Sequence, residues 1–162
     1  MTAHDFSFPG IAGGEIRLAD FAGRPLLLVN TASECGFTPQ YAELQALWSR
    51  YRDRGLVVIG VPSNDFGAQE PDDEAAIKAF CSKGFGVDFP MTVKQTVIGG
   101  EAHPLYRWMV EELGEVAAPK WNFHKLLIAP DGSLAGLWAS AVEPLDPQIT
   151  EAIDGLLDDA AR

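Results

Sequence analysis

The side chain best suited to chemistry is the thiol of Cys35, which lies between an apolar, strand-like run and the predicted start of a helix. The run covers Pro25–Asn30, and Thr38 and Pro39 have the residue types of a helix N-cap and a first helical position. Backbone N–H groups and the positive end of a helix dipole favour a thiolate at such a turn, and the thiolate is the nucleophilic form of cysteine. A cysteine is more often a small buried apolar residue, but the polar loop around Cys35 and the adjacent Gly36 favour a reactive thiol.

Activation of this thiol requires hydrogen-bond donors from elsewhere in the chain. A free cysteine has a pKa of about 8.5, and lowering that pKa to about 6.5 takes about 2.7 kcal/mol. No lysine or arginine lies within ten residues of Cys35, and the neighbouring Glu34 has the wrong sign. Neutral donors occur in two later segments, Pro62–Pro71 and Lys120–Lys125, as Gln and Asn amides and a Trp indole. One or two such bonds to a thiolate, each worth about 1.5–3 kcal/mol, would suffice.

Three sequence motifs together resemble the glutathione peroxidase family, in the family's order and with its approximate spacing. They are Asn-Thr-Ala-Ser-Glu-Cys-Gly-Phe-Thr, Asn-Asp-Phe-Gly-Ala-Gln-Glu-Pro and Trp-Asn-Phe-His-Lys, and the resemblance covers nearly the whole chain. It implies that the chain is a peroxidase and that Cys35 is the residue oxidised by peroxide. It further implies that Gln69, Trp121 and Asn122 are the other members of a catalytic tetrad.

The chain departs from the family pattern at four positions near these motifs, none of them a tetrad member. Where many relatives have cysteine, glutamine, glutamate and valine, it has Ser63, Asp65, His124 and Thr31. We expect Asp65 to add a negative charge near the site and so to disfavour the thiolate. The short stretch between Leu113 and Trp121, where oligomeric relatives insert a long loop, resembles the compact, monomeric phospholipid-hydroperoxide type.

The predicted reaction begins with attack of the Cys35 thiolate on a hydroperoxide oxygen. The O–O bond breaks, water or an alcohol leaves, and Cys35 becomes a sulfenic acid. Hydrogen peroxide and organic or lipid hydroperoxides are the expected substrates, and an antioxidant role in the oxidative stress response is the expected setting. No cofactor is expected, and the three histidines show no metal-ligand spacing.

Two routes can return the sulfenic acid to the thiol. If Cys81 resolves it, an intramolecular disulfide forms and a thioredoxin-type protein reopens it by exchange; otherwise glutathione reduces Cys35 directly. The resemblance favours the first route, because thioredoxin-dependent relatives hold a resolving cysteine in the same segment before Phe89-Pro90. Counting back without gaps can place that residue at Ser82, in which case Cys81 is a core residue. A redox sensor that relays oxidation of Cys35 to a partner protein is a third possibility.

The order of the elements predicts an α/β, thioredoxin-like fold with a central mixed sheet flanked by helices and an N-terminal β-hairpin. Strands are expected at Phe6–Phe8, Glu15–Leu18, Pro25–Asn30, Leu56–Val61, Phe89–Val93, Lys125–Ala129 and Ser133–Ala139. Helices are expected at Pro39–Arg54, from Asp72 to near Gly84, at Pro104–Leu113 and at Pro147–Ala161. No internal repeat or linker interrupts this order, so residues 1–162 are expected to form a single thioredoxin-like peroxidase domain.

Composition and charge narrow the class of protein. A chain of 162 residues with 47% hydrophobic content can bury one core but has no room for two domains. Met1–Asp5 lacks the basic region of a secretory signal, and no apolar run approaches membrane-spanning length. Two cysteines do not make a disulfide scaffold, so a reducing, cytoplasmic compartment is expected. The net charge of −11 argues against nucleic acid or an anionic membrane as a stable partner.

Overall fold

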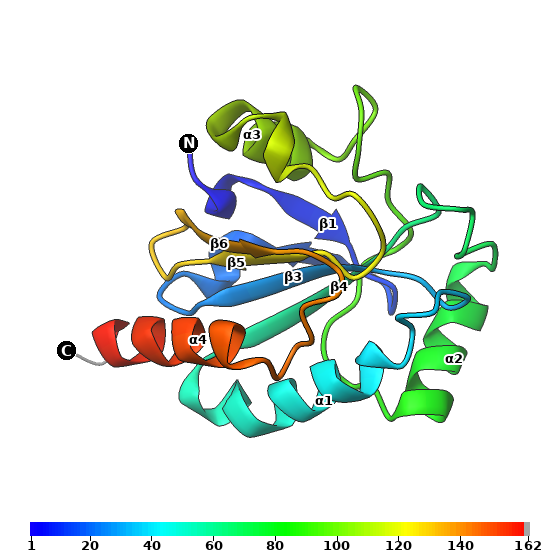
Figure 1. Ribbon diagram of the computed structural model, residues 1–162, viewed down its shortest axis with the longest axis horizontal. Helices are drawn as coiled ribbons and strands as arrows, with labels where there is room; N and C mark the ends of the chain where they lie inside the picture. The colour runs from blue at the N-terminus through cyan, green and yellow to red at the C-terminus, as the bar shows by residue number, and fades with distance from the viewer. Residues whose placement is uncertain (161–162) are drawn as a thin grey trace.

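The computed structural model describes residues 1–160 and has a four-stranded mixed sheet at its centre, in the order β4-β3-β5-β6 (Figure 1). β3 (Leu26–Thr31) pairs in parallel with β4 (Val57–Pro62) and antiparallel with β5 (Lys125–Ile128). β5 pairs in turn with β6 (Leu134–Trp138). β3 and β4 are buried at every position, as expected for strands covered on both faces.

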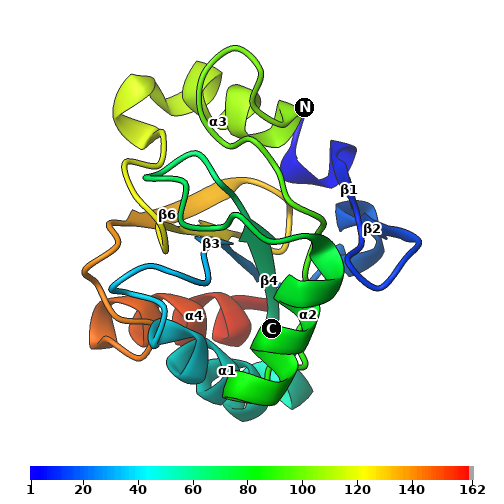
Figure 2. The ribbon, with the colours of Figure 1, turned by 90° about the vertical axis from the view of Figure 1, so that its right-hand side faces the viewer.

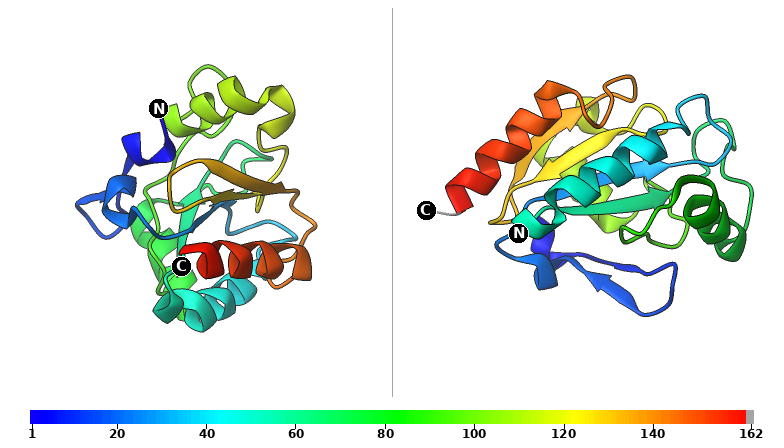
Figure 3. Two further views of the ribbon diagram at one scale, coloured as in Figure 1. Left: turned by 90° about the vertical axis from the view of Figure 1, so that its left-hand side faces the viewer. Right: turned by 90° about the horizontal axis from the view of Figure 1, so that it is seen from below.

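Helices cover both faces of this sheet. α1 (Gln40–Tyr51) and α4 (Pro147–Ala160) lie side by side on one face, as Figure 3 shows, and α3 (Pro104–Leu113) lies on the other. α2 (Glu74–Phe85) lies across the edge of the sheet at which β3 and β4 end (Figure 2). Because β3 and β4 are parallel, the loops that follow them leave the sheet at the same edge, and these loops contain Cys35 and Gln69.

The N-terminal hairpin is confirmed as a separate two-stranded sheet of β1 (Ser7–Pro9) and β2 (Glu15–Arg17). The predicted strand at Phe89–Val93 is wrong. This segment makes only two isolated bridges, between Gly60 and Met91 and between Gly10 and Thr92. Pro90 has no N–H to donate, so a continuous ladder cannot form there. Short 3₁₀ helices complete the fold at Ala3–Asp5, Leu18–Phe21, Arg52–Arg54 and Glu115–Ala117.

The boundaries of α2 differ from the predicted ones. Asp73, and not Asp72, is the N-cap, because its carboxylate accepts a hydrogen bond from the backbone N–H of Ala76 at 2.9 Å. The helix continues through Gly84 and ends at Gly86, whose φ of +64° is the left-handed conformation of a C-terminal cap. The predicted last residue of the C-terminal helix, Ala161, lies outside the described residues.

Candidate active site

The Cys35 loop is closed by a side chain that the sequence assigns elsewhere. Thr38 does not cap α1; Pro39 holds the N-cap position without a side-chain bond. The Thr38 hydroxyl instead accepts from the backbone N–H of Cys35 and donates to the carbonyl of Ala32, both at 2.9 Å. The N–H of Phe37 donates to the Cys35 sulfur at 3.3 Å, and 8% of Cys35 is exposed. The loop therefore holds a nearly buried thiol with a backbone donor already aimed at its sulfur.

The structure brings Gln69 and Asn122 together. Asn122 Nδ2 donates to Gln69 Oε1 at 2.9 Å and reaches the carbonyl of Phe66 at 3.5 Å. Asn122 is fully buried and Gln69 is half-buried. The bond occupies the acceptor of Gln69, so its Nε2 group remains available to donate toward a thiolate or a peroxide oxygen.

Two strained backbone positions hold the segments that carry these side chains. Ala68 and Phe123 have φ values of +51° and +63°, which non-glycine residues adopt only when their surroundings require it. Asn30, in β3, fixes the second segment: its Nδ2 donates to the carbonyl of Trp121 at 2.9 Å, and its carbonyl accepts from Phe123 N–H at 2.6 Å. Strain at both positions indicates that the orientation of Gln69 and Asn122 is imposed by the fold.

Trp121 packs directly over the first of these segments. Its ring lies 5.9 Å from that of Phe66, centroid to centroid. A Cβ atom placed on Gly67 would lie 3.1 Å from the Trp121 ring, and Gly67 has φ of +66°. Backbone N–H of Glu34 donates to the carbonyl of Gln69 at 3.0 Å, which ties the Cys35 loop to the same segment. All three motifs of the sequence are thus in mutual contact.

Three of the four departures from the family pattern, Asp65, Ser63 and His124, are buried or hydrogen-bonded within the fold. Asp65 does lie in the loop that carries Gln69, but its Oδ2 accepts hydrogen bonds from the backbone N–H groups of Val97 and Ile98, at 2.6 and 3.3 Å. The Asp65 carboxylate is therefore held by backbone N–H groups of the segment that contains Val97 and Ile98. Ser63 is buried and accepts from Asp65 N–H at 3.3 Å. His124 is buried, and burial, with Lys125 and Lys120 nearby, lowers its pKa to about 4, so its ring is neutral at pH 7.

Cys81 is a buried residue of α2, 1% exposed, and its thiol is free, as is that of Cys35. Burial raises the pKa of Cys81 to about 11, with the charge of Glu70 acting in the same direction and Tyr41 opposing it. Residues 1–160 contain no cluster of three or more His, Cys, Asp or Glu side chains that could hold a metal ion.

Two buried charged residues near the site were missed by the sequence reasoning. Lys125 Nζ donates to Gln40 Oε1 at 2.6 Å and to the carbonyl of Ser140 at 2.9 Å, which ties β5 to the start of α1. Burial lowers its pKa to about 8. Glu70, next to Gln69, is fully buried. Glu70 lies in the second motif, between the predicted donor Gln69 and Pro71, and this position was the signal that could have drawn attention to it. The residue types around Glu70 did not show that its side chain is buried.

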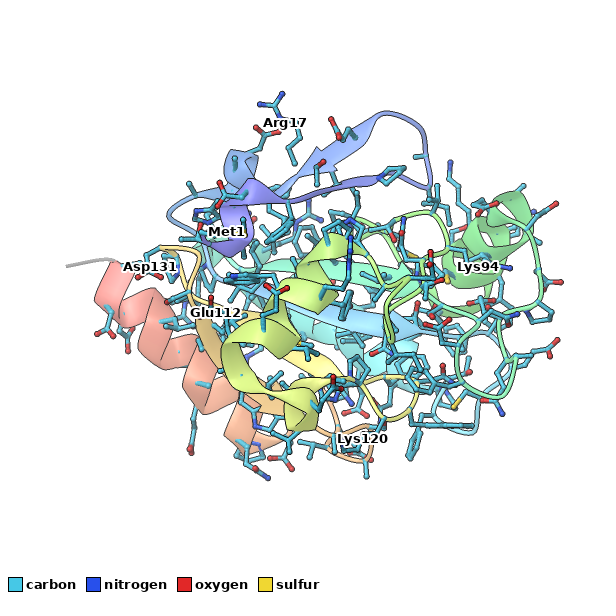
Figure 4. All side chains as sticks on the ribbon, turned by 90° about the horizontal axis from the view of Figure 1, so that it is seen from above. Met1, Arg17, Lys94, Glu112, Lys120 and Asp131 are labelled. Carbon is cyan, nitrogen blue, oxygen red and sulfur yellow. The ribbon has the colours of Figure 1, made fainter. Side chains whose placement is uncertain are left out.

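A mostly apolar groove of about 510 Å³ begins beside Trp121 and Phe37. Leu137 and Trp138 of β6 form part of its wall, and Lys120, on the segment between α3 and β5 (Figure 4), adds a cation to the lining. The groove gives a bulky, apolar molecule a place to lie against the ring of a predicted catalytic residue.

Comparison with known proteins agrees with this geometry. The family model for glutathione peroxidase matches residues 3–110, which include the Cys35 loop, Gln69 and Cys81. The chain belongs to the glutathione peroxidase family. Membership confirms the resemblance in the sequence, and it makes the chain a thiol-dependent peroxidase that acts on hydroperoxides.

Individual relatives of this glutathione peroxidase align over almost their whole length. It is 44% identical over 159 residues to the glutathione peroxidase homolog BsaA of Halalkalibacterium halodurans, covering 97% of this chain and 100% of the relative. It is 42% identical over 164 residues to the hydroperoxy fatty acid reductase gpx1 of Synechocystis, covering 96% of each. A crystal structure of a thioredoxin-family thiol:disulfide interchange protein from Chlorobium tepidum matches with a TM-score of 0.70 at 15% identity, over 94% of this chain and 92% of that one. That likeness confirms the thioredoxin-like fold.

Proposed function

We propose that this peroxidase reduces hydrogen peroxide and organic or lipid hydroperoxides through a sulfenic acid on Cys35, which Cys81 and a thioredoxin-type protein return to the thiol. The observation that carries the proposal is the 2.9 Å hydrogen bond between Asn122 and Gln69. It joins two neutral donors from distant parts of the sequence beside the loop that holds Cys35. A neutral donor set of this kind stabilises a thiolate and a developing alkoxide without a nearby cation.

In the proposed first step, Cys35 Sγ attacks one oxygen of the hydroperoxide and the O–O bond breaks. The sulfur keeps that oxygen as a sulfenic acid, and the other oxygen leaves as water or an alcohol after taking a proton. The amides of Gln69 and Asn122 and the indole of Trp121 stabilise the leaving oxygen. The N–H of Phe37, 3.3 Å from the sulfur, stabilises the thiolate before attack.

In the proposed second step, Cys81 attacks the sulfenic acid and forms a disulfide, which requires the two Cα atoms to come within about 7 Å. The packing of α2 supports such a movement. Only Ile77 and Cys81 of this helix are buried, and Cβ atoms placed on Gly84 and Gly86 would touch nothing within 4 Å. A pocket of about 430 Å³ lies beside Cys81. A helix held by so few buried contacts can unwind at small cost.

The remaining parts of the proposal concern substrate and setting. The apolar groove beside Trp121 suits an organic hydroperoxide, and a relative in Synechocystis is named a hydroperoxy fatty acid reductase. We propose a monomer that forms one domain over residues 1–162, needs no cofactor besides its thiol reductant, and works in the reducing cytoplasm. None of the helices in residues 1–160 has the length and apolar character of a membrane span.

Turnover of hydrogen peroxide with thioredoxin or with glutathione as the sole reductant tests the recycling route. We expect kcat/KM with thioredoxin to be at least about tenfold higher than with glutathione, equivalent to about 1.4 kcal/mol. The reason is that a chain of net charge −11 should bind the two carboxylates of glutathione poorly. Cys81→Ser should lose turnover with thioredoxin and accumulate sulfenic or sulfinic Cys35, seen by intact mass. Ser82→Ala, at the neighbouring exposed position, is the control and should recycle normally.

Two results would change the assignment. Normal recycling of Cys81→Ser with thioredoxin would make Cys81 a core residue and leave a one-cysteine peroxidase reduced by an external thiol. One fast oxidation of Cys35 without turnover by either reductant would indicate a redox sensor.

A further inference from the structure

The first sequence motif runs from Asn30 to Thr38, and the reaction steps described above leave its last residue without a role. Thr38 lies in the connection of residues 32–39 between β3 and α1, which contains no helix or strand (Figure 1). Thr38 is buried, and so is Cys35, three residues before it. A buried polar side chain in an irregular loop requires hydrogen-bond partners, and the partners of Thr38 indicate its role.

Thr38 binds both backbone polar groups of Cys35. The N–H of Cys35 donates to Thr38 Oγ1 at 2.9 Å, and the N–H of Thr38 donates to the carbonyl of Cys35 at 3.0 Å. The Thr38 hydroxyl donates in turn to the carbonyl of Ala32 at 2.9 Å. One residue therefore closes the turn that carries the thiol with three hydrogen bonds.

The carbonyl of Thr38 attaches this turn to the rigid part of the molecule. It accepts from the N–H of Tyr41 at 3.0 Å, in the first turn of α1. Tyr41 is completely buried, and its ring lies 5.3 Å from that of Phe123, centroid to centroid. Phe123 directly follows Asn122 in the third motif. Thr38 thus fixes the Cys35 turn relative to α1, which packs against the segment that carries Asn122.

The Thr38 hydroxyl cannot also donate to the sulfur, because its single proton is used by the Ala32 carbonyl. The N–H of Cys35 is likewise used, by Thr38. The donor that does contact Cys35 Sγ is the N–H of Phe37, at 3.3 Å, and Phe37 directly precedes Thr38. Loss of the hydroxyl would leave the Cys35 N–H and the Ala32 carbonyl without this partner inside the loop. The turn would then rearrange to satisfy them, and the Phe37 N–H would no longer be directed at the sulfur.

We propose that Thr38 is the positioning residue of the reactive thiol: its hydroxyl holds the Cys35 turn so that the N–H of Phe37 stabilises the thiolate. The proposal rests on the proposed function in one respect, since it requires Cys35 to be the residue that peroxide oxidises. It does not depend on the route by which Cys35 is recycled. A thiolate held by a donor that is already in place needs little reorganisation before it attacks a peroxide oxygen.

The test compares Thr38→Val, which keeps the shape of the side chain without the hydroxyl, with Thr38→Ser, which keeps the hydroxyl. Both are made in a Cys81→Ser background, and oxidation of Cys35 by hydrogen peroxide is followed by stopped flow. Thr38→Val should slow oxidation at least about tenfold and move the midpoint of Cys35 alkylation about one pH unit higher, because its thiolate loses a fixed donor. Thr38→Ser should react within about threefold of the Cys81→Ser parent. An unchanged rate and midpoint in Thr38→Val overturn the proposal.

Thr92→Val is the matched control for loss of a buried hydroxyl. Thr92 is buried, and its hydroxyl donates to the carbonyl of Val93 at 2.7 Å, outside the three motifs. Both valine variants should lower the free energy of urea unfolding, but Thr92→Val should keep the parent's oxidation rate and alkylation midpoint. A merely structural role for Thr38 predicts that the two variants behave alike in all three measurements, and that result also overturns the proposal.

NMR of the isotope-labelled wild type covers the case in which Thr38→Val does not fold. The amide proton of Phe37 should titrate with the same midpoint as alkylation of Cys35, because a thiolate accepts this hydrogen bond more strongly than a thiol does. The amide proton of Cys35 should exchange slowly with solvent, because it is bound to Thr38 Oγ1. A Phe37 signal that does not titrate, or fast exchange at Cys35, overturns the proposal.

Failure of this inference and failure of the proposed function give different results. If Thr38→Val is oxidised at the parent's rate, Thr38 has no positioning role and the peroxidase reaction stands. If peroxide does not oxidise Cys35 in the wild type, the proposed function itself is wrong.

Discussion

Gln69 and Asn122 should act as one unit in oxidation of Cys35, because each holds the other in place. Asn122 Nδ2 is 2.9 Å from Gln69 Oε1. Each of the two residues is next to a residue with a strained, positive φ, Phe123 beside Asn122 and Ala68 beside Gln69. Substituting either residue by alanine removes its own donor and also the hydrogen bond that orients the amide of its partner. A hydrogen bond to a charged group is worth about 1.5–3 kcal/mol, so each single substitution should slow oxidation about tenfold to a hundredfold.

The double variant Gln69→Ala/Asn122→Ala should then cost much less than the two single effects combined. Loss of the first amide already misplaces the second, so the coupling free energy should be at least about 1 kcal/mol. The double variant should therefore react at least about fivefold faster than the product of the single effects predicts.

The assay is the second-order rate constant of Cys35 oxidation by hydrogen peroxide, by stopped flow, in a Cys81→Ser background that isolates the first step. Alkylation of Cys35 as a function of pH gives the thiol pKa in parallel, and it should rise in both single variants. Gln45→Ala is the control, because Gln45 is an exposed amide on α1 that bonds Ser49 and Asp88. Strictly multiplicative effects would refute the idea of a coupled pair. If the alkylation curves of both single variants match the wild type, the backbone N–H of Phe37, and not the two amides, stabilises the Cys35 thiolate.

Three other expectations each rest on a single residue. Cys35→Ser should abolish peroxide consumption and leave the unfolding midpoint unchanged. Residual turnover above about one per cent of the wild-type rate would contradict the assignment of Cys35 as the nucleophile. Gly67→Ala should lower the free energy of unfolding by about 1–2 kcal/mol and slow oxidation of Cys35, because Gly67 has φ of +66° and an alanine Cβ there would lie 3.1 Å from the Trp121 ring. Gly84→Ala is the control: a Cβ on Gly84 has no neighbour within 4 Å, so this substitution should not lower the free energy of unfolding. Burial lowers the pKa of Lys125 to about 8, so between about pH 8 and 10.4 the unfolded chain binds a proton that the folded chain does not, and the stability of the wild type should rise with pH in that range. Lys125→Met should lack this rise. Equal pH dependence of urea unfolding in the two proteins would contradict the prediction.

Much of the fold could be predicted because local pattern and tertiary environment agree. β3 and β4 are continuous apolar runs and are buried at every residue, and α3 has the predicted bounds from Pro104 to Leu113. The segment from Phe89 to Val93 has strand-like residue types, but it makes only isolated bridges to Gly60 and Gly10, because Pro90 interrupts a continuous ladder. Pairing of that kind depends on tertiary contacts that residue types do not encode.

The sequence predicted which residues form the candidate site but not which bonds they make. The order of the motifs predicted Gln69, Trp121 and Asn122 as its members, and the structure brings the segments that carry them into contact. Thr38 matched an N-cap by type and position, yet its hydroxyl serves the Cys35 loop, because a nearby carbonyl and N–H compete successfully with the helix end. Asp65 looked like a charge at the site, and its carboxylate instead bonds a segment more than thirty residues later in the sequence.

The segment after β4 joins all three motifs of the candidate site. Ala68, at φ of +51°, directly precedes Gln69. Gln69 then accepts from Asn122 through its side-chain oxygen, at 2.9 Å, and from Glu34 N–H through its backbone carbonyl, at 3.0 Å. Because these contacts are already made in the structure, the neutral donor of Gln69 needs little reorganisation when charge develops on the leaving oxygen. A strained loop suits this donor, since strain that the surrounding fold imposes keeps its orientation fixed.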